Sequence, residues 1–390
     1  MIDLARRLWN LGRRAEEPGF SFDRPLVILQ SDDWGRVGVR DQEGFEQLRA
    51  EGIPLGQHPY DFYSMETAED LAAIQELLSR HCDSTGRPAC VVMNFLVANL
   101  NFPKMAEKGF QGIELLPLAK GLPGKWQRPG LFEAYREGIR GGVFYPALHG
   151  LTHFCRPAVE HGLQTSEERR ELLLKLWRAE TPYIYWRMPW IGYEFWNPEE
   201  PNAGALAQEV QQDLIRLAAE GFAKVFHAFP ESACAPGYRA NNDTRAAWHK
   251  WGVRVAQNGS GAPLPPFIDE FEVLNLSRTV DLEPAQKDLP LEKYIQLMDD
   301  CFARGVPAIV SVHSINFHSS LRNFRDTTLE TLDQLLSAIE AKYKDLLYVH
   351  DGDLYRIVTR GKFQAAAGPV AVTVKQRGTA KARSVSLGAK

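Results

Sequence analysis

Short apolar runs rich in β-branched residues alternate with longer amphipathic stretches along most of this 390-residue chain. This alternation is typical of parallel strands joined by crossover helices. Seven or more such units favour a barrel over an open sheet, although the pattern alone leaves both open. The predicted strands are Leu26–Gln30, Cys90–Leu96, Val143–Leu148, Tyr183–Arg187, Lys224–Ala228, Val253–Gln257, Phe271–Leu276, Ala308–Val312 and Leu346–His350; the predicted helices are Thr67–His81, Glu167–Ala179, Ala205–Glu220, Asn242–Lys250, Leu291–Arg304 and Thr328–Lys344.

Residues 21–360 are predicted to form this α/β barrel. Ahead of it, Leu4, Leu8 and Leu11 lie at helical spacing, so residues 1–20 are predicted to form an amphipathic helix that packs on the body or on a partner. Residues 361–390 are rich in small and basic residues and are predicted to form a flexible tail. Residues 181–203 are dense in aromatic residues and proline, and are predicted to form a loop over the barrel mouth.

Composition excludes several classes of function. With 45 basic and 49 acidic residues, the chain has no general electrostatic attraction to nucleic acid or to anionic membranes. Its five cysteines are scattered and include no CxxC pair, which argues against a disulfide framework and a cysteine-based zinc site. We find no signal peptide and no apolar run long enough to span a membrane, so we expect a cytoplasmic protein with no membrane insertion. The composition is compatible with a homo-oligomer.

Two adjacent carboxylates, Asp32 and Asp33, follow the predicted strand Leu26–Gln30. An α/β barrel places its active site at this end of its strands. Two like charges in a low-dielectric site repel each other, so one takes up a proton unless a cation lies nearby. A helix cap is the alternative explanation, because aspartate is common at helix N-termini.

The segment His149-Gly-Leu-Thr-His153 directly follows another predicted strand. Two imidazoles four residues apart can face one metal ion, although this spacing also arises by chance. One aspartate and the two histidines together make a three-ligand set with open positions, which is typical of catalytic rather than structural metal sites.

Arg187 and His313 also lie at the ends of predicted strands. Arg187 could pair with Asp32 and keep it ionised, and His313 could protonate a leaving amine. The alternatives are a surface arginine on an aromatic loop and a core histidine bonded to backbone.

In this order, the motifs Asp32-Asp33, His149-x-x-x-His153, Arg187-Met188-Pro189-Trp190 and His313 resemble those of the polysaccharide deacetylase superfamily of NodB-like carbohydrate esterases. The resemblance covers about Arg24 to Val358 and implies a distorted (β/α)7 barrel that binds a divalent metal, most often zinc. It implies that Asp33, His149 and His153 are the metal ligands, Asp32 the general base, Arg187 its partner, His313 the acid and the backbone N–H of Trp190 an oxyanion donor.

The chain departs from the family pattern in the region before His313. The family's Asp-Trp pair, which tunes the late histidine, is absent after the predicted strand Lys224–Ala228; Glu231 is a possible substitute. The longer segment that follows holds Cys234–Arg239 and two added strand candidates, so we expect an altered pocket. Trp34, Tyr238 and Arg239, with Trp190, are the residues predicted to contact substrate.

These features predict a metal-dependent hydrolase that removes an acetyl group from an N-acetylated sugar or a related small substrate. The alternatives are hydrolysis of another C–N bond, as in a cyclic amide or ureide, and a catalytically silent glycan-binding module. Because no secretion signal is present, a small or precursor substrate is expected rather than mature cell-wall polymer.

Overall fold

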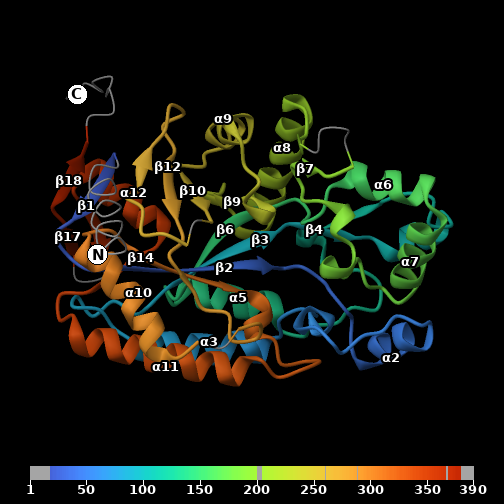
Figure 1. Cartoon of the computed structure of the whole chain (residues 1–390), viewed down its shortest axis with the longest axis horizontal. Helices are drawn as coiled ribbons and strands as arrows, with labels where there is room; N and C mark the ends of the chain where they lie inside the picture. Colours follow the sequence, from blue (N-terminus) through green and yellow to red (C-terminus); the bar gives the residue numbers. More distant parts are fainter. Residues whose placement is uncertain (1–17, 200–203, 260, 288, 366–367, 379–390) are drawn as a thin grey trace, which may run out of the picture.

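A curled parallel sheet forms the centre of the molecule (Figure 1). The computed structural model describes residues 18–199, 204–259, 261–287, 289–365 and 368–378. In the sheet, the strand order is β11-β12-β10-β9-β6-β3-β2-β14-β13, and every neighbouring pair is parallel except β11 with β12. Strand β15 pairs in parallel with the start of β2.

The two ends of this strand order belong to one continuous segment. Strands β12 (Leu274–Ser277) and β13 (Val280–Asp281) are separated only by Arg278 and Thr279. The N–H of Arg278 donates to Asn258 O in β10, at 2.9 Å, and the N–H of Thr279 donates to Ile309 O in β14, at 3.1 Å. Residues 274–281 therefore bond to β10 and then to β14. With β12 and β13 counted as one, the sheet has seven parallel positions, and the predicted distorted (β/α)7 barrel is confirmed.

The other strands of the sheet are β2 (Leu26–Trp34), β3 (Val91–Leu96), β6 (Phe144–Gly150), β9 (Ser232–Cys234), β10 (Val255–Asn258), β11 (Phe267–Ile268), β14 (Ala308–His313) and β15 (Leu347–Tyr348). Two-stranded sheets are formed by β1 (Gly19–Phe22) with β18 (Val374–Arg377), β4 (Ala98–Leu100) with β5 (Leu115–Pro117), β7 (Trp196–Asn197) with β8 (Gly204–Ala205), and β16 (Lys362–Ala365) with β17 (Gly368–Ala371).

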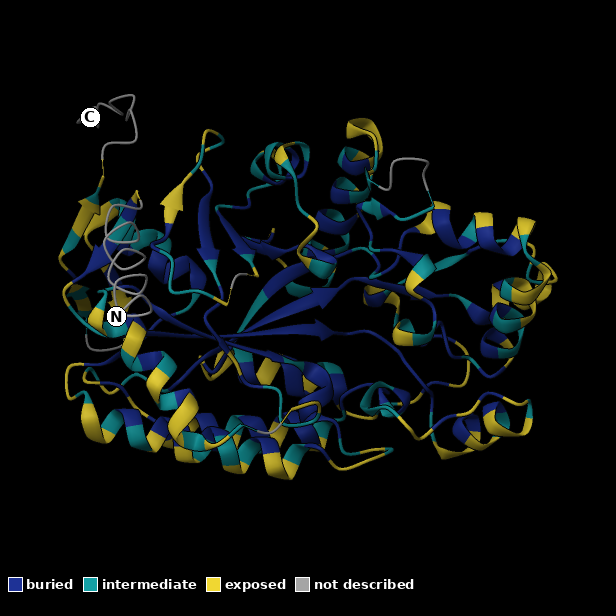
Figure 2. Cartoon of the chain, viewed as in Figure 1, coloured by how far each residue is buried: buried dark blue, intermediate teal, exposed yellow. Residues whose placement is uncertain are grey.

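The helices are α2 (Gln42–Ala50), α3 (Ala68–Arg80), α4 (Phe102–Glu107), α5 (Leu131–Arg140), α6 (Arg156–Thr165), α7 (Glu167–Arg178), α8 (Gln208–Phe226), α9 (Asn242–Lys250), α10 (Leu291–Ala303), α11 (Arg325–Lys342) and α12 (Asp351–Arg360). Helices α3, α5, α10 and α11 lie along one side of the sheet and α8 and α9 along the other (Figure 1). Exposed residues gather on the outer faces of these helices, while the strands between them are buried (Figure 2).

The alternation of side chains along β2 explains how the strand supports both a core and a site. Val27 and Leu29 belong to the large apolar cluster that the surrounding helices cover. Leu26 and Ile28 point the other way, into a second cluster that contains Leu354 of α12. Because successive side chains of a strand alternate between faces, the next residues on this inner face are polar ones, Gln30 and Asp32. Helix α12 thus packs against one end of the barrel interior, and the polar residues lie toward the other end.

Two predicted strands are wrong. Residues 183–187 instead contain the 3-10 helix η3 (Tyr185–Arg187), followed by η4 (Pro189–Ile191). Residues 224–226 instead form the end of α8, whose buried positions Ile215, Ala219 and Phe222 keep the helical period, and His227 takes a left-handed conformation directly after the helix. The two added strand candidates correspond to β10 and β12, and both belong to the barrel itself.

The structure describes part of each of the two predicted terminal segments, residues 1–20 and residues 361–390. Most of the predicted helix 1–20 lies outside the described residues, and Gly19–Phe22 forms strand β1. Residues 362–377, which fall in the predicted flexible tail, contain strands β16, β17 and β18. Strand β18 pairs with β1, so this part of the tail is attached to the start of the barrel domain.

Candidate metal centre and acid–base residues

Asp33, His149 and His153 converge at the carboxyl end of the barrel strands. Asp33 Oδ1 lies 3.6 Å from His149 Nε2 and 3.5 Å from His153 Nε2. Ligand atoms of a tetrahedral site with bonds of about 2.1 Å are separated by about 3.4 Å, so the spacing matches that of a zinc-type ion. The structure therefore brings together the three residues predicted to be metal ligands.

Local backbone structure aims Asp33 at the two histidines. Asp33 has a positive φ of 74°, a conformation uncommon for residues other than glycine. The pairing of β2 with β3 shifts register between Ser31 and Trp34 at the same place. A bulge of this kind redirects a side chain, which explains how two consecutive aspartates both reach one site from a single strand.

Burial keeps both histidines in the form that binds metals, and a hydrogen bond sets the tautomer of His149. The Nδ1 of His149 lies 2.8 Å from the carbonyl oxygen of Cys234, which leaves Nε2 free of its proton and facing Asp33. Burial lowers the pKa of His149, and it lowers the pKa of His153 to about 3. Neutral imidazole is the ligand form, so both rings are ready to coordinate a cation.

The aromatic segment predicted to lie over the barrel mouth packs around His153. The rings of Tyr183, Tyr185 and Tyr193 have centroids 5.7–6.4 Å from that of His153.

Arg36 lies 3.3 Å from Asp33 Oδ1 and is stacked on Tyr63, with 3.8 Å from its guanidinium carbon to the ring centroid. Burial raises the pKa of Asp33, but the Arg36 charge and the nearby histidines outweigh burial and lower it to about 2.

The donor set fits a divalent metal. Two imidazole nitrogens and one carboxylate oxygen suit zinc and similar transition ions. Asp33 Oδ1 is buried and, among the described residues, accepts no hydrogen bond, which is costly for a carboxylate oxygen.

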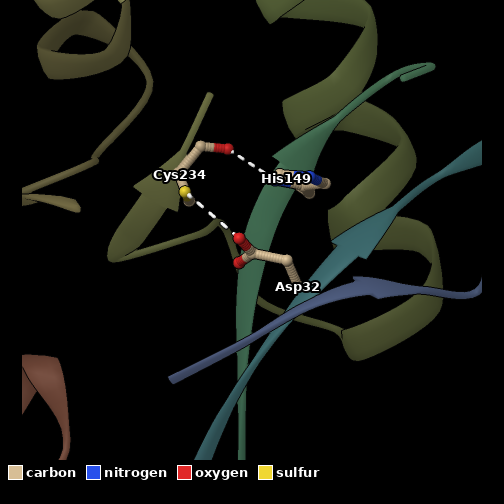
Figure 3. A group of neighbouring side chains, drawn as sticks. All are labelled: Asp32, His149 and Cys234. Carbon is tan, nitrogen blue, oxygen red and sulfur yellow. Dashed lines mark hydrogen bonds between the residues drawn. The ribbon is translucent and has the colours of Figure 1, made fainter. Parts of the chain in front are cut away.

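A second group of metal-capable side chains, Asp32, His149 and Cys234, lies beside the first (Figure 3). Asp32 comes from β2, His149 from β6 and Cys234 from β9. The Cys234 thiol is 3.9 Å from Asp32 Oδ2. Burial raises the pKa of this thiol well above its usual value, and Asp32 is already paired with an arginine. The group of Asp33, His149 and His153 is therefore the better ligand set.

Asp32 is paired with Arg278, a residue that the sequence analysis missed. Arg278 donates from Nη1 to Asp32 Oδ2 and from Nη2 to Asp32 Oδ1, both at 2.6 Å, and Asn94 Nδ2 donates to Oδ1 at 2.7 Å. Burial by itself would raise the pKa of Asp32, but the Arg278 charge and hydrogen bond hold it well below its usual range. Asp32 is therefore ionised at neutral pH. Arg278 directly follows the observed strand β12 and lies two residues after the predicted strand Phe271–Leu276, a position similar to the strand end that singled out Arg187.

The predicted pairing of Arg187 with Asp32 is not what the structure shows. Arg187 Nε lies 3.3 Å from Asp61 Oδ1, and the guanidinium stacks on Trp186 at 4.0 Å. Residues 185–187 form a 3-10 helix instead of a strand, so Arg187 is not carried to the end of a barrel strand.

The four residues predicted to contact substrate are placed differently from one another. Trp34 is fully buried and stacks on Phe317. Trp190 packs against Gly162 of α6 and beneath the guanidinium of Arg169. Arg239 stacks on Trp196. Tyr238 alone reaches the polar centre, where its hydroxyl accepts a hydrogen bond from Arg278 at 2.9 Å.

His313 has an acidic partner, but it is Glu283 and not Glu231. The His313 Nδ1 lies 2.6 Å from Glu283 Oε1, and its Nε2 lies 4.0 Å from Asp32 Oδ2. Burial favours neutral His313, but the charge and hydrogen bond of Glu283 outweigh it and raise the pKa of His313 to about 9. Glu231 instead accepts from Tyr145 and pairs with Arg356. Glu283 follows the short strand β13, which the sequence analysis did not recognise.

A buried polar layer lies beneath Asp32 and Arg278. Arg278 Nε donates to Gln30 at 3.1 Å, and its Nη2 donates to Gln257 at 2.9 Å. Both glutamines donate in turn to Asp351, at the start of α12, at 2.8 Å. Burial raises the pKa of Asp351 to about 6. This layer fixes the guanidinium so that it meets Asp32 with two hydrogen bonds.

Comparisons with known proteins find structural likeness alone. No protein-family model and no curated protein matches the sequence. Among solved structures, the chain is similar to one from Parabacteroides distasonis assigned as a glycoside hydrolase or deacetylase, with 10% identity, TM-score 0.48 and coverage of 90% of this chain and 77% of that one.

Two further solved structures are similar over most of this chain. One, from Mycobacterium smegmatis, is assigned as a polysaccharide deacetylase and has 11% identity, TM-score 0.44 and coverage of 86% and 90%. The other is a carbohydrate esterase family 4 pseudoenzyme from Bacillus anthracis, with 11% identity, TM-score 0.35 and coverage of 85% and 66%. Because all three TM-scores are below 0.5, the case for a function rests on the residues of this chain. No helix within the described ranges is both long and apolar enough to cross a membrane.

Proposed function

We propose that this protein is a metal-dependent hydrolase that removes an acetyl group from an N-acetylated sugar or a related small molecule. The observation that carries the proposal is the juxtaposition of three systems at one end of the barrel: the ligand set of Asp33, His149 and His153, the Asp32–Arg278 pair and the His313–Glu283 pair.

When bound by Asp33, His149 and His153, a divalent cation supplies Lewis acidity and lowers the pKa of water. Asp32 is placed to accept the proton from the attacking water. Its Oδ1 accepts from Arg278 and Asn94, but Oδ2 has one strong donor, Arg278, and the weak Cys234 thiol. A carboxylate oxygen has two lone pairs, so Oδ2 retains capacity for water on the side that faces His313.

His313 is placed to act as the general acid. Glu283 holds its Nδ1, so Nε2 carries the proton that is available for transfer. Because Glu283 favours the charged ring, His313 is protonated at neutral pH and can deliver this proton to the nitrogen of the departing amine. The two acid–base residues thus have opposite partners, an arginine for the base and a glutamate for the acid, and each partner holds the protonation state that the reaction needs.

The proposal is tested by metal content and acetate release. Purified protein should contain close to one equivalent of a divalent transition metal by atomic spectroscopy and should release acetate from N-acetylated sugars. The D32N variant should keep the metal and lose about 100-fold or more of the turnover, whereas H149A should lose the metal. A metal-free H149A protein with full activity would disprove the proposal. Metal-loaded wild-type protein that opens a cyclic amide without releasing acetate would favour the second chemistry.

A further inference from the structure

An open cavity of about 530 Å³ adjoins the acid–base residues on the His313 side. This volume falls in the range of sites for small molecules. Strands β13 and β14 form its wall together with the segments that follow β9, β10, β12 and β13. The cavity is lined by Tyr238, Gly259, Gly261, Arg278, Asp281, Glu283, Gln286, Ser311 and His313.

The position of His313 decides which part of the substrate enters this cavity. On the proposed function, His313 gives a proton to the amine that departs, while the acetyl group lies toward the metal ligands. Asp33, His149 and His153 are absent from the cavity wall, and His313 is part of it. The amine-bearing part of the substrate therefore occupies the cavity.

Each cationic group of the described wall already has a carboxylate partner within the protein. Arg278 donates to Asp32, Gln30, Gln257, Ser311 and Tyr238, so the hydrogen bonds of its guanidinium are used within the protein. His313 is paired with Glu283, and Glu283 also accepts from Asn316. A phosphate or carboxylate entering this space would find, on the described part of the wall, no cation whose charge is not already balanced by a carboxylate.

Asp281 is the carboxylate of the described cavity wall that has no cationic partner. It ends strand β13, is exposed and lines the cavity, and among the described residues no basic side chain lies within ion-pairing distance of it. Since Asp32 neutralises Arg278 and Glu283 neutralises His313, the charge that the cavity presents to a ligand is that of Asp281. Electrostatic complementarity selects between partners of opposite charge, so this wall favours a cation.

We propose that the cavity binds the amine-bearing part of a small substrate that carries a second, positively charged amino group, with Asp281 as its counter-ion. The proposal rests on the proposed function and narrows its substrate. Nucleotide-linked and other phosphorylated sugars are disfavoured, because a phosphate would face Asp281 while both cations of the described wall are already balanced by carboxylates.

Three N-acetylated compounds test the selectivity. The first is a glucosamine disaccharide with one acetamide and one free amine, the second is the matched disaccharide with both amines acetylated, and the third is UDP-N-acetylglucosamine. Acetate release should show kcat/KM values that fall by about tenfold from the first compound to the second and further for the third. The D281N variant should bring the ratio of the first two close to one, and D281K should reverse it. The exposed Asp213 provides a matched control, because D213N should leave the ratio unchanged.

Binding to protein stripped of metal with a chelator separates this proposal from the proposed function. Calorimetry on that protein should give a Kd for the free-amine disaccharide about tenfold lower than for the neutral one, and D281N should remove the difference. Equal affinities in wild-type protein, tighter binding of the UDP sugar, or a difference that survives in D281N would overturn the cavity assignment. A wild-type protein that binds no metal would instead overturn the proposed function, while the calorimetric comparison would still decide the role of Asp281.

Discussion

Asp32 and Asp33 are neighbours on one strand, yet the protein gives them separate cationic partners. Asp32 meets Arg278 through two hydrogen bonds of 2.6 Å, whereas Asp33 faces Arg36 and two neutral histidines. The left-handed backbone at Asp33 breaks the strand alternation and turns both carboxylates into one site. Two buried carboxylates this close are tolerated because each has its own source of positive charge.

Because Asp32 is paired with Arg278, we expect the stability and the turnover of the protein to depend on Arg278 and not on Arg187. Replacing Arg278 with methionine leaves Asp32 buried without a counter-ion, and losing one partner of a buried pair costs about 3–5 kcal/mol. We therefore expect R278M to lower the free energy of unfolding by that amount in urea titrations and to reduce kcat by about 100-fold or more. R187M, the matched control, removes a partner of Asp61 and should leave kcat within about fivefold of wild type. Equal losses of kcat in the two variants would contradict the pairing assigned to Asp32.

The raised pKa of His313 predicts the alkaline limb of the pH profile of kcat/KM. The acid form of His313 is needed, and its raised pKa means that this form is present below a pH of about 9 and is lost as the pH rises through that value. In E283Q the carboxylate that stabilises the charged ring is gone, so the alkaline limb of kcat/KM should move to lower pH. The measurement is kcat/KM of wild type and of E283Q with the same substrate over a range of pH. An unchanged alkaline limb in E283Q would show that this pair does not set it.

At the scale of elements, the turn that carries the two histidines is held by one buried acid. Glu194 Oε1 accepts from the N–H groups of Leu151 at 2.8 Å and Thr152 at 3.1 Å. Gly150 beside it has no room for a side chain, because a Cβ there would lie 2.1 Å from Glu194 Oε2. Burial raises the pKa of Glu194 to about 8, so its carboxyl is largely neutral at pH 7. The side chain therefore acts as a rigid acceptor for the His149–His153 turn and not as a charge.

This arrangement predicts different results for two substitutions of Glu194. E194Q keeps the acceptor oxygen and the neutral charge, and should bind metal nearly as wild type does. E194A leaves the N–H groups of Leu151 and Thr152 without their acceptor and frees the turn, so its metal affinity should fall by about 10–100-fold. Competition with a chromophoric chelator measures both affinities, and circular dichroism checks that the fold is kept. If E194A bound metal as tightly as E194Q, the role assigned to Glu194 would be wrong.

The elements that the sequence predicted correctly are those with a strong local period. The helices α3, α7, α9 and α10 and the strands β3, β6 and β14 match their predicted ranges closely, whereas β2 starts at Leu26 as predicted and continues beyond Gln30 to Trp34. The failures have tertiary causes. The run Lys224–Ala228 resembles a strand, but its first three residues end α8, where Val225 and Phe226 pack partly buried against the core. Tyr183–Arg187 folds over His153 because its aromatic rings pack there. Strand β13 has two residues, which is too short for any period to appear.

At the scale of the whole molecule, the site residues that the sequence predicted have a local sequence pattern, whereas those that it did not predict depend on tertiary structure. Asp33, His149 and His153 could be found because each lies at or beside the end of a recognisable strand. Arg278 and Glu283 lie on either side of the short β13, and their roles follow from barrel closure. Residues 274–281 bond to β10 and then to β14, which carries Arg278 across to Asp32 and Glu283 to His313. Closure is a long-range property, so the local position of Arg278 after a strand does not show that it meets Asp32, and Arg187 is predicted in its place.

Metal binding should raise the free energy of unfolding of the whole chain by a measurable amount. A ligand that binds the folded protein alone adds about 2.7 kcal/mol to the free energy of unfolding at a free concentration of 100 times its Kd. Zinc should therefore raise the Tm of wild-type protein in a concentration-dependent way, because the ligand set brings together β2 and the turn after β6, which meet only in the folded barrel. H149A should lose this dependence. H161A, which replaces an exposed histidine of α6, should keep it, since His161 is not part of the ligand set. An equal rise of Tm in wild type and H149A would place the metal elsewhere on the chain.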